Sequence, residues 1–432
     1  MMPIIKIEKF DETKVEEFLA RPVLEDEAAL KAVRQILEDV RREGDRALLK
    51  YTKEFDGADL TEMGLAVRKE EIHEAYSSVG EEFVAAIRFA KERILGFHEK
   101  QKTSSWFTTE KEGIWLGQLI RPITRVGIYI PGGLASYPST VLMNAIPASV
   151  AGVKEIAMCV PPRSDGKMNP FTLVAAEETG VDEIYKLGGA QAIAALAYGT
   201  ETVKKVDKIT GPGNIYVNLA KKLVVGHVGI DMLAGPSEVL ILADEKADPR
   251  FIAADMLGQA EHAPDATALL ITTSLKLAER VNSAVHEQLS GLKRREVAEE
   301  SIKNRGRVFV VSDIEMGIKL ANAIAPEHLE LMVEEPLKFL NDIENAGAIF
   351  LGPYSTEALG DYMAGPNHVL PTGGSARFSS PLGVDDFAKK SSVLIFTKSG
   401  LEKLAKAVTV LAQAEGLEGH AKSVKIRVEG SE

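Results

Sequence analysis

The sequence predicts an α/β protein with two parallel-sheet domains, a helical N-terminal segment and a small helical C-terminal tail. From about residue 125, short apolar segments that end in Gly or Pro alternate with helical stretches. This alternation is typical of parallel strands joined by helical crossovers. The alternation occurs in two successive series, which predicts two sheets. A length of 432 residues is enough for two or three domains.

The N-terminal region, residues 1–125, is predicted to be helical. Apolar residues follow the 3.6-residue period of a helix at Val33, Ile36, Leu37 and Val40. A second long helical pattern is "EEFVAAIRFAKERILGFHEK". We expect this region to pack with the second α/β domain.

The first α/β series, residues 126–236, has four strand candidates, each followed by a helical stretch. These strands are "RVGIYIPGG", "VKEIAMCVPP", "VDEIYKLGG" and "VDKITGPGN". Their glycine-rich ends would lie at the carboxyl edge of a parallel sheet, which is where open α/β folds bind ligands.

The second series, residues 237–378, repeats the plan with "SEVLILAD", "TALLITTS", "RVFVVSD" and "AGAIFLG" as strands. Residues 379–432 differ from it. A polar connector rich in Gly and Ser leads into a mainly helical tail that ends the chain.

Composition excludes several classes of function. The net charge of −12 repels phosphate backbones, so we expect no nucleic-acid partner. No apolar run reaches 18 residues and the N-terminus lacks a signal-peptide core, which predicts a cytoplasmic protein with no membrane segment. The single cysteine, Cys159, excludes an internal disulfide and a cysteine zinc cage, and its apolar strand predicts a buried thiol.

Four polar stretches could carry chemistry. In "QAEH", Gln259 and His262 are three residues apart and would share one face of a helix, although a solvated helix end is the favoured explanation when this pair is taken alone. The others are Glu327 and His328 in "APEHLEL", Asp361 and His368 in "GDYMAGPNHVLPTGG", and Glu415 and His420 in "EGLEGH". A surface helix start is the simple alternative for "APEHLEL".

Two imidazoles, a carboxylate and an amide from these stretches would suit a zinc site that exchanges ligands with a substrate. No G-x-G-x-x-G fingerprint is present, so motif rules alone do not predict a dinucleotide cofactor. The residues by themselves therefore indicate a cytoplasmic α/β enzyme, with a catalytic metal as one alternative.

The sequence closely resembles the histidinol dehydrogenase family over nearly its whole length. The resemblance rests on ordered motifs that include "YIPGGLASYPSTVLMNAIPA", "GGAQAIAALAYGT", "KITGPGNIYV", "DMLAGPSEVLI", "QAEHAPDA", "APEHLEL", "GDYMAGPNHVLPTGG" and "EGLEGHAKSV". It implies oxidation of L-histidinol to L-histidine through L-histidinal, with two NAD and one zinc ion per site. It also implies Rossmann-like but incomplete sheets, and a homodimer in which the tail reaches the partner subunit's site.

The resemblance implies roles for individual residues. The implied zinc ligands are Gln259, His262, Asp361 and His420. The implied proton-handling pair is Glu327, which activates water, and His328, which removes the alcohol proton. The implied NAD-binding residues are Tyr129, Gln191 and Asn214.

Substrate binding is implied for Ser237 and Glu415, together with the four zinc ligands and His328. His368 is assigned only to orienting its loop. Two rival functions use the same residues. A zinc hydrolase would use Glu327 as a general base on metal-bound water, and a metal-stabilised scaffold would need neither Glu327 nor His328.

Overall fold

The computed structural model describes residues 1–11, 26–132 and 136–430, and its contacts divide the chain into two units. The first unit is Met1–Gln101 with Thr124–Phe387, and the second is Lys102–Ile123 with Ala388–Glu432. Two separate parallel sheets lie in the first unit, which confirms the predicted α/β class with two parallel-sheet domains.

The first sheet has five parallel strands in the order β6-β5-β4-β7-β8. They are β4 (Arg125–Tyr129), β5 (Glu155–Val160), β6 (Glu183–Lys186), β7 (Lys208–Thr210) and β8 (Gly229–Ile230). The crossovers contain α6 (Pro138–Ala151), α7 (Pro170–Thr179), α8 (Gly189–Tyr198) and α9 (Ile215–Val224). The four strand candidates of the first series are therefore confirmed as β4 to β7.

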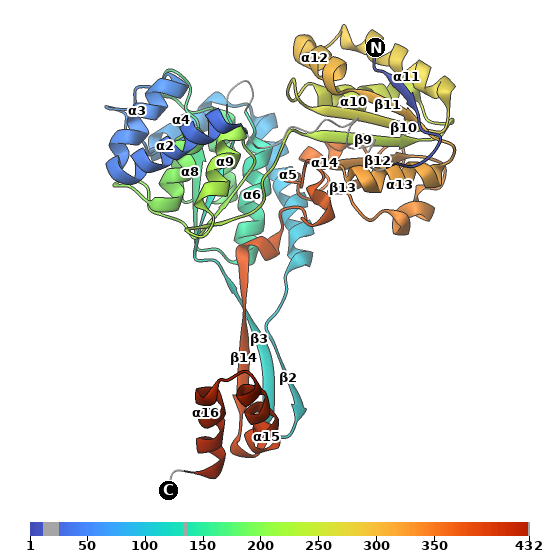
Figure 1. Ribbon diagram of the computed structural model, residues 1–432. Helices are drawn as coiled ribbons and strands as arrows, with labels where there is room; N and C mark the ends of the chain where they lie inside the picture. The colour runs from blue at the N-terminus through green and yellow to red at the C-terminus, as the bar shows by residue number, and fades with distance from the viewer. Residues whose placement is uncertain (12–25, 133–135, 431–432) are drawn as a thin grey trace. The chain divides into compact units, whose positions relative to one another are not determined.

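The N-terminal helices cover this first sheet. They are α2 (Glu27–Glu43), α3 (Asp45–Asp56), α4 (Lys69–Ser78) and α5 (Glu81–His98), followed by the 3-10 turn η1 (Glu99–Gln101). The predicted apolar stripe of α2 is buried in one cluster with residues of α8 and α9. Figure 1 shows α2 beside these two helices.

The structure therefore differs from the expectation that residues 1–125 pack with the second domain. Residues 190–197 of α8 are buried all round, and a helix that is apolar on every side needs a second layer over it. Helices α2 and α3 supply that layer. Only β1 (Ile4–Lys6) joins the second sheet, where it pairs with β11.

The second sheet has six parallel strands in the order β1-β11-β10-β9-β12-β13. Its strands after β1 are β9 (Glu238–Ala243), β10 (Thr267–Thr272), β11 (Arg307–Val310), β12 (His328–Met332) and β13 (Ala348–Leu351). Its helices are α10 (Pro249–Ala260), α11 (Leu275–Leu289), α12 (Arg295–Arg305), α13 (Ile314–Ile324) and α14 (Glu357–Tyr362). The short 3-10 turns are η2 (Pro336–Asp342), η3 (Ser375–Arg377) and η4 (Val384–Phe387).

Alternating residues of this sheet form two cores. Val239 and Ile241 of β9 pack with α10, α11 and α12, whereas Leu240 and Leu242 pack with α13 on the opposite face. Figure 1 shows the two helical layers on either side of the sheet. Both faces are therefore covered, as parallel sheets require.

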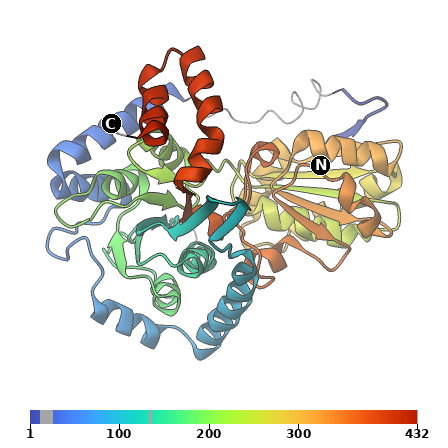
Figure 2. The same cartoon turned by 90° about the horizontal axis from the view of Figure 1, so that it is seen from below.

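The second unit is an antiparallel sheet with two helices. Strands β2 (Trp106–Lys111), β3 (Ile114–Pro122) and β14 (Ala388–Phe396) lie in the order β14-β3-β2. Helices α15 (Lys398–Ala414) and α16 (Glu418–Glu429) lie side by side, as Figure 2 shows. The tail is helical as predicted, but β14 was not expected, and neither was its pairing with residues from before β4.

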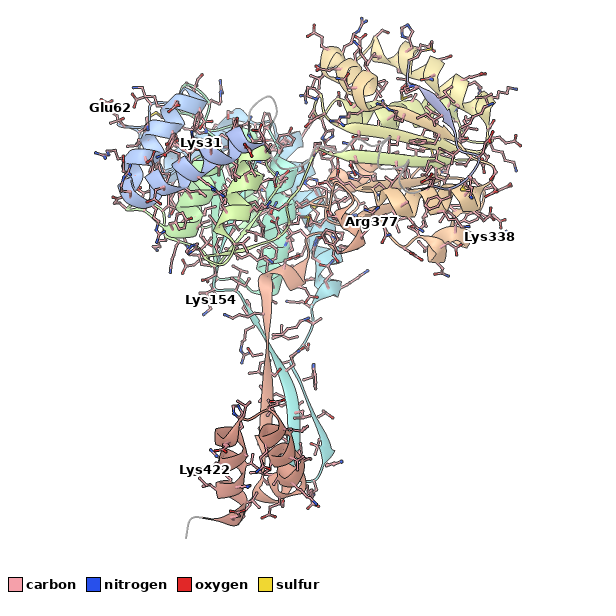
Figure 3. All side chains as sticks on the ribbon, viewed as in Figure 1. Lys31, Glu62, Lys154, Lys338, Arg377 and Lys422 are labelled. Carbon is pink, nitrogen blue, oxygen red and sulfur yellow. The ribbon has the colours of Figure 1, made fainter. Side chains whose placement is uncertain are left out.

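Many charged side chains lie on the surface, although several are buried. Lys31, Lys338 and Lys422 are exposed and point away from the ribbon (Figure 3). In the described part of the chain, no helix combines the length and apolar character needed to cross a membrane.

A buried ion pair holds the glycine turn after β7. Lys221 Nζ lies 2.5 Å from Asp231 Oδ1, and both side chains are completely buried. Lys221 also donates to the Gly211 carbonyl at 2.9 Å, and Asp231 Oδ2 accepts the Gly211 amide at 2.8 Å. Gly211 has a φ of +114°, and a Cβ there would lie 2.1 Å from the Tyr129 carbonyl oxygen. The turn that leads to Asn214 is therefore rigid.

Replacing Lys221 by methionine should destabilise the protein by about 3–5 kcal/mol, because the Asp231 carboxylate would stay buried without its counter-charge. Denaturant unfolding at neutral pH measures this loss. The matched control is Lys222→Met, an exposed neighbour on the same helix, with an expected change within about 0.5 kcal/mol. Equal stability of the two variants would contradict the prediction.

Candidate active site

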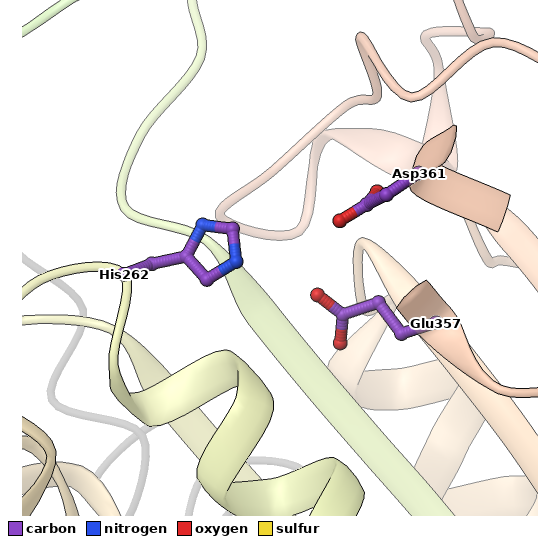
Figure 4. Close-up of side chains that lie close together, drawn as sticks. All are labelled: His262, Glu357 and Asp361. Atoms are coloured by element: carbon purple, nitrogen blue, oxygen red, sulfur yellow. The ribbon is translucent and has the colours of Figure 1, made fainter. Parts of the chain in front are cut away.

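Three side chains that can bind a metal converge at the amino edge of the second sheet. One ligand atom from each of His262, Glu357 and Asp361 lies within 4.8 Å of the others. His262 follows the end of α10, while Glu357 and Asp361 are one turn apart on α14 and so share a face. Figure 4 shows the three side chains pointing toward one another.

Gln259 joins this group from the last turn of α10. It is completely buried, and with its NH2 group turned toward Glu357 its amide nitrogen donates to both carboxylate oxygens, at 2.9 and 3.0 Å. Three of the four residues predicted as metal ligands therefore lie together. The fourth, His420, lies in α16 of the second unit, and Glu415 lies at the end of α15 in the same unit.

Glu357 was missed in the sequence. Its signal was the i, i+4 spacing from Asp361 in "STEALGD", which places two carboxylates on one helical face once Thr356 is read as the N-cap. The helix has only six residues, and no apolar period marks it.

Glu327 and His328 lie beside the group, at the start of β12. The simple alternative for "APEHLEL", a helix start on the surface, is wrong. Every residue of β12 is buried, and the strand lies between β9 and β13. The run "HLELM" does not read as an apolar strand because its polar residues are buried at the site. Glu327 Oε2 accepts the Glu238 amide at 2.8 Å.

The hydrogen bond of His328 fixes its tautomer. Its Nδ1 lies 3.0 Å from the Glu238 carbonyl oxygen, which can only accept, so Nδ1 carries the proton. In the neutral ring, Nε2 is then the basic atom, and it has no hydrogen-bond partner in the described part of the chain. Burial lowers the pKa of His328, which keeps the ring neutral.

Several buried carboxyl groups lie close together around this group, and their negative charges repel one another. Burial, followed by the charges of Glu238 and Asp361, raises the pKa of Glu327 well above its usual range. Burial and the charges of neighbouring acids, with Asp361 the largest, do the same for Glu357. A bound cation would relieve this repulsion, and the available donors are nitrogen and oxygen atoms, which zinc accepts. The residues therefore fit a zinc ion.

A cavity of about 840 Å³ opens beside these residues. His328, Asp361 and His368 line it together with Phe350. His368 Nδ1 lies 3.0 Å from the Asp361 carbonyl, and its Nε2 lies 3.2 Å from the Thr140 hydroxyl in α6. The cavity is large enough for a small polar substrate.

The residues predicted to bind NAD lie at the carboxyl edge of the first sheet. Tyr129 ends β4, and its hydroxyl accepts the Gly189 amide at 3.1 Å. Asn214 caps α9 by accepting the amides of Tyr216 and Val217. Gln191, in the first turn of α8, is buried with neither amide atom bonded within the described ranges.

Ser237 directly precedes β9, at the same amino edge as Glu327 and His328. Its carbonyl accepts the Thr267 amide at 2.9 Å, which joins the starts of β9 and β10. Its side chain is only partly buried and thus remains available.

Comparisons with known proteins agree over the whole chain. A model of the histidinol dehydrogenase family matches residues 19–428. The chain is 55% identical to a histidinol dehydrogenase of Syntrophotalea carbinolica, covering 96% of each, and 56% identical to one of Halalkalibacterium halodurans, covering 92% of this chain and 93% of the other. The crystal structure of a histidinol dehydrogenase from Elizabethkingia anophelis matches with a TM-score of 0.94 and 41% identity, over 99% of this chain and 98% of that one.

Proposed function

Because the chain belongs to the histidinol dehydrogenase family, and is therefore an oxidoreductase, we propose that it oxidises L-histidinol to L-histidine through L-histidinal. The reaction removes four electrons and uses two NAD and one zinc ion per site. The observation that carries this proposal is the convergence of Gln259, His262 and Asp361 beside the basic Nε2 of His328.

The metal ligands are Gln259, His262 and Asp361, with His420 as the fourth. When bound, zinc supplies anchoring positions for the amine and imidazole of the substrate, and NAD supplies the hydride acceptor for each oxidation. Ser237 and Glu415 bind the remaining polar groups of the substrate. The substrate alcohol is thereby oriented toward His328.

In the first oxidation, His328 acts as the general base. Nε2 takes the hydroxyl proton of L-histidinol while the carbon loses a hydride, and the product is the aldehyde. The bond from Nδ1 to the Glu238 carbonyl holds the ring in the required tautomer, and the lowered pKa keeps it unprotonated at neutral pH.

In the second oxidation, Glu327 activates water. The carboxylate takes a proton from a water molecule, and the hydroxide adds to the carbonyl carbon of L-histidinal. The resulting hydrate has a C–H bond from which the second hydride leaves, which gives the carboxylic acid. The buried position of Glu327 and its bond to the Glu238 amide hold its carboxylate in place.

NAD binds at the carboxyl edge of the first sheet, with Tyr129, Gln191 and Asn214. The buried, unbonded amide of Gln191 supports this placement, because an unsatisfied buried polar group is costly unless a ligand completes it. The glycine turns beside these residues allow a close approach of the cofactor.

The enzyme acts as a homodimer that exchanges its tail, so that Glu415 and His420 complete the partner subunit's site. Large apolar side chains of the second unit are exposed, among them Trp106, Phe107, Leu394, Val410 and Leu411. Apolar surface of this kind marks an association site. The proposal places the enzyme in the cytoplasm, where both oxidations draw on the NAD pool.

The test is the amount of NADH formed per L-histidinol consumed by zinc-loaded protein, run to completion. Two NADH with L-histidine as product would support the proposal, whereas no NADH would overturn it in favour of a hydrolase. Removing zinc with a chelator should abolish activity while the circular dichroism of the protein is retained. Unfolding on chelation would favour the metal-stabilised scaffold instead.

Replacing Cys159 by alanine should leave the rates of both oxidations within about twofold of the wild type. Cys159 is fully buried in β5, and burial raises the pKa of its thiol, so it cannot form a thiol adduct with the aldehyde. Steady-state rates with L-histidinol and with L-histidinal check this. A variant that stops at the aldehyde would contradict the hydrate route.

A further inference from the structure

We propose that Glu357 is a positioning residue that holds the Gln259 amide with its carbonyl oxygen turned toward the metal. This inference rests on the proposed zinc site. It concerns a residue outside the predicted ligand set, and it follows from the contacts of the two side chains.

Gln259 is the one predicted ligand whose end group is ambiguous. Its amide presents an oxygen on one side and an NH2 group on the other, and only the oxygen can bind zinc. Because Gln259 is completely buried, water cannot select the orientation, and a neighbouring side chain must do so.

Glu357 makes that selection. When the Gln259 amide is oriented with its NH2 group toward Glu357, that nitrogen lies 2.9 and 3.0 Å from the two carboxylate oxygens, whereas the opposite orientation sets the amide oxygen against two carboxylate oxygens. A cation at the site favours the ionised form of Glu357, which only accepts, so the NH2 side of the amide faces Glu357 and the carbonyl oxygen faces away. Partners of this kind orient metal ligands in many sites.

Glu357 is itself held in place. Its side chain is buried, and its backbone amide donates to Glu330 Oε1 at 2.9 Å. It shares the short helix α14 with Asp361, so the positioning residue and one metal ligand are fixed relative to each other. Its carboxylate is also near enough to His262 and Asp361 to bind a metal directly, and the experiment must separate these two roles.

The experiment is a double-mutant cycle on zinc affinity, measured on the full-length protein by competition with a chromophoric chelator. Glu357→Leu removes the acceptor and should weaken zinc binding about 10- to 100-fold. In a Gln259→Met background, where no amide needs orienting, the same substitution should change the affinity by no more than about twofold. An equal loss in both backgrounds would show direct ligation and overturn the proposal.

Two further variants sharpen the result. Glu357→Gln keeps the shape and one carbonyl acceptor, so it should recover part of the affinity, and it completes the cycle should Glu357→Leu fail to fold. If Glu357→Gln recovered none of the zinc affinity lost in Glu357→Leu, the positioning role would be contradicted. Asp255→Asn removes another carboxylate, a partly buried one, from the same region and should bind zinc within about twofold of the wild type. A loss equal to that of Glu357→Leu would assign the effect to charge and overturn the proposal.

The failure of this inference is distinguishable from the failure of the proposed function. If the wild-type protein bound no zinc, the proposed function would fail first. If the wild type binds zinc and forms two NADH, but the cycle shows no coupling between Glu357 and Gln259, only the positioning role is overturned.

Discussion

Glu327→Gln is expected to slow the oxidation of L-histidinal by about a hundred- to ten-thousandfold while the oxidation of L-histidinol to the aldehyde is largely retained. Glutamine keeps the size of the side chain and can still occupy the space beside the Glu238 amide, but it cannot take a proton from water. Rates measured separately with each substrate, and the identity of the product at completion, give the result.

The pH dependence supplies a second readout for Glu327. Burial, with the charges of Glu238 and Asp361, raises its pKa, and only the ionised form is a base. Oxidation of L-histidinal by the wild type should therefore rise as pH increases through that pKa and fall below it. The rate of Glu327→Gln should lack this rise with pH. The exposed Glu335→Gln serves as the control and should behave as the wild type, whereas equal losses in both oxidations would remove the assigned role.

The second large effect is expected at His328. His328→Asn should lower kcat for L-histidinol by about a hundred- to ten-thousandfold, because His328 Nε2 is a basic nitrogen with no partner in the described part of the chain. His368 also lines the cavity with its Nδ1 on a carbonyl oxygen, but its Nε2 already lies 3.2 Å from the Thr140 hydroxyl. Zinc content should stay at the wild-type value, because His328 lies outside the ligand set.

Zinc content and kcat, measured together, show whether His328 is a general base or a zinc ligand. The matched control is His286→Asn, an exposed histidine on α11, for which no change is expected. Retained activity in His328→Asn would place the base elsewhere. Loss of zinc would make His328 a ligand and not a base.

The elements that the sequence predicted well are those with a local signal. The stripe of α2 follows the helical period, and β4 to β7 are apolar runs closed by Gly or Pro. In strand β12, polar His328 and Glu330 alternate with apolar Leu329 and Leu331, a pattern typical of a strand with one solvated face, yet every residue of the strand is buried. The burial of its polar face could not be predicted without knowing what surrounds the strand.

The site was predictable only in part, for a related reason. Gln259 and His262 share a helix face, and their spacing can be read directly. The contact between Gln259 and Glu357 joins two helices far apart in the chain, and no local pattern records it. The placement of β14 against β3 is equally non-local, which explains why residues 102–123 were grouped with the N-terminal helices.

The pairing of β14 with β3 also determines the order in which parts of the chain can fold during synthesis. Strand β3 leaves the ribosome long before its partner β14, and β1 likewise emerges long before its partner β11. Closing such long loops is slow, because the chain loses conformational entropy before the stabilising contacts between the two strands form. The first sheet and its N-terminal helices can fold while translation continues, whereas the unit that carries Glu415 and His420 forms only after β14 has emerged.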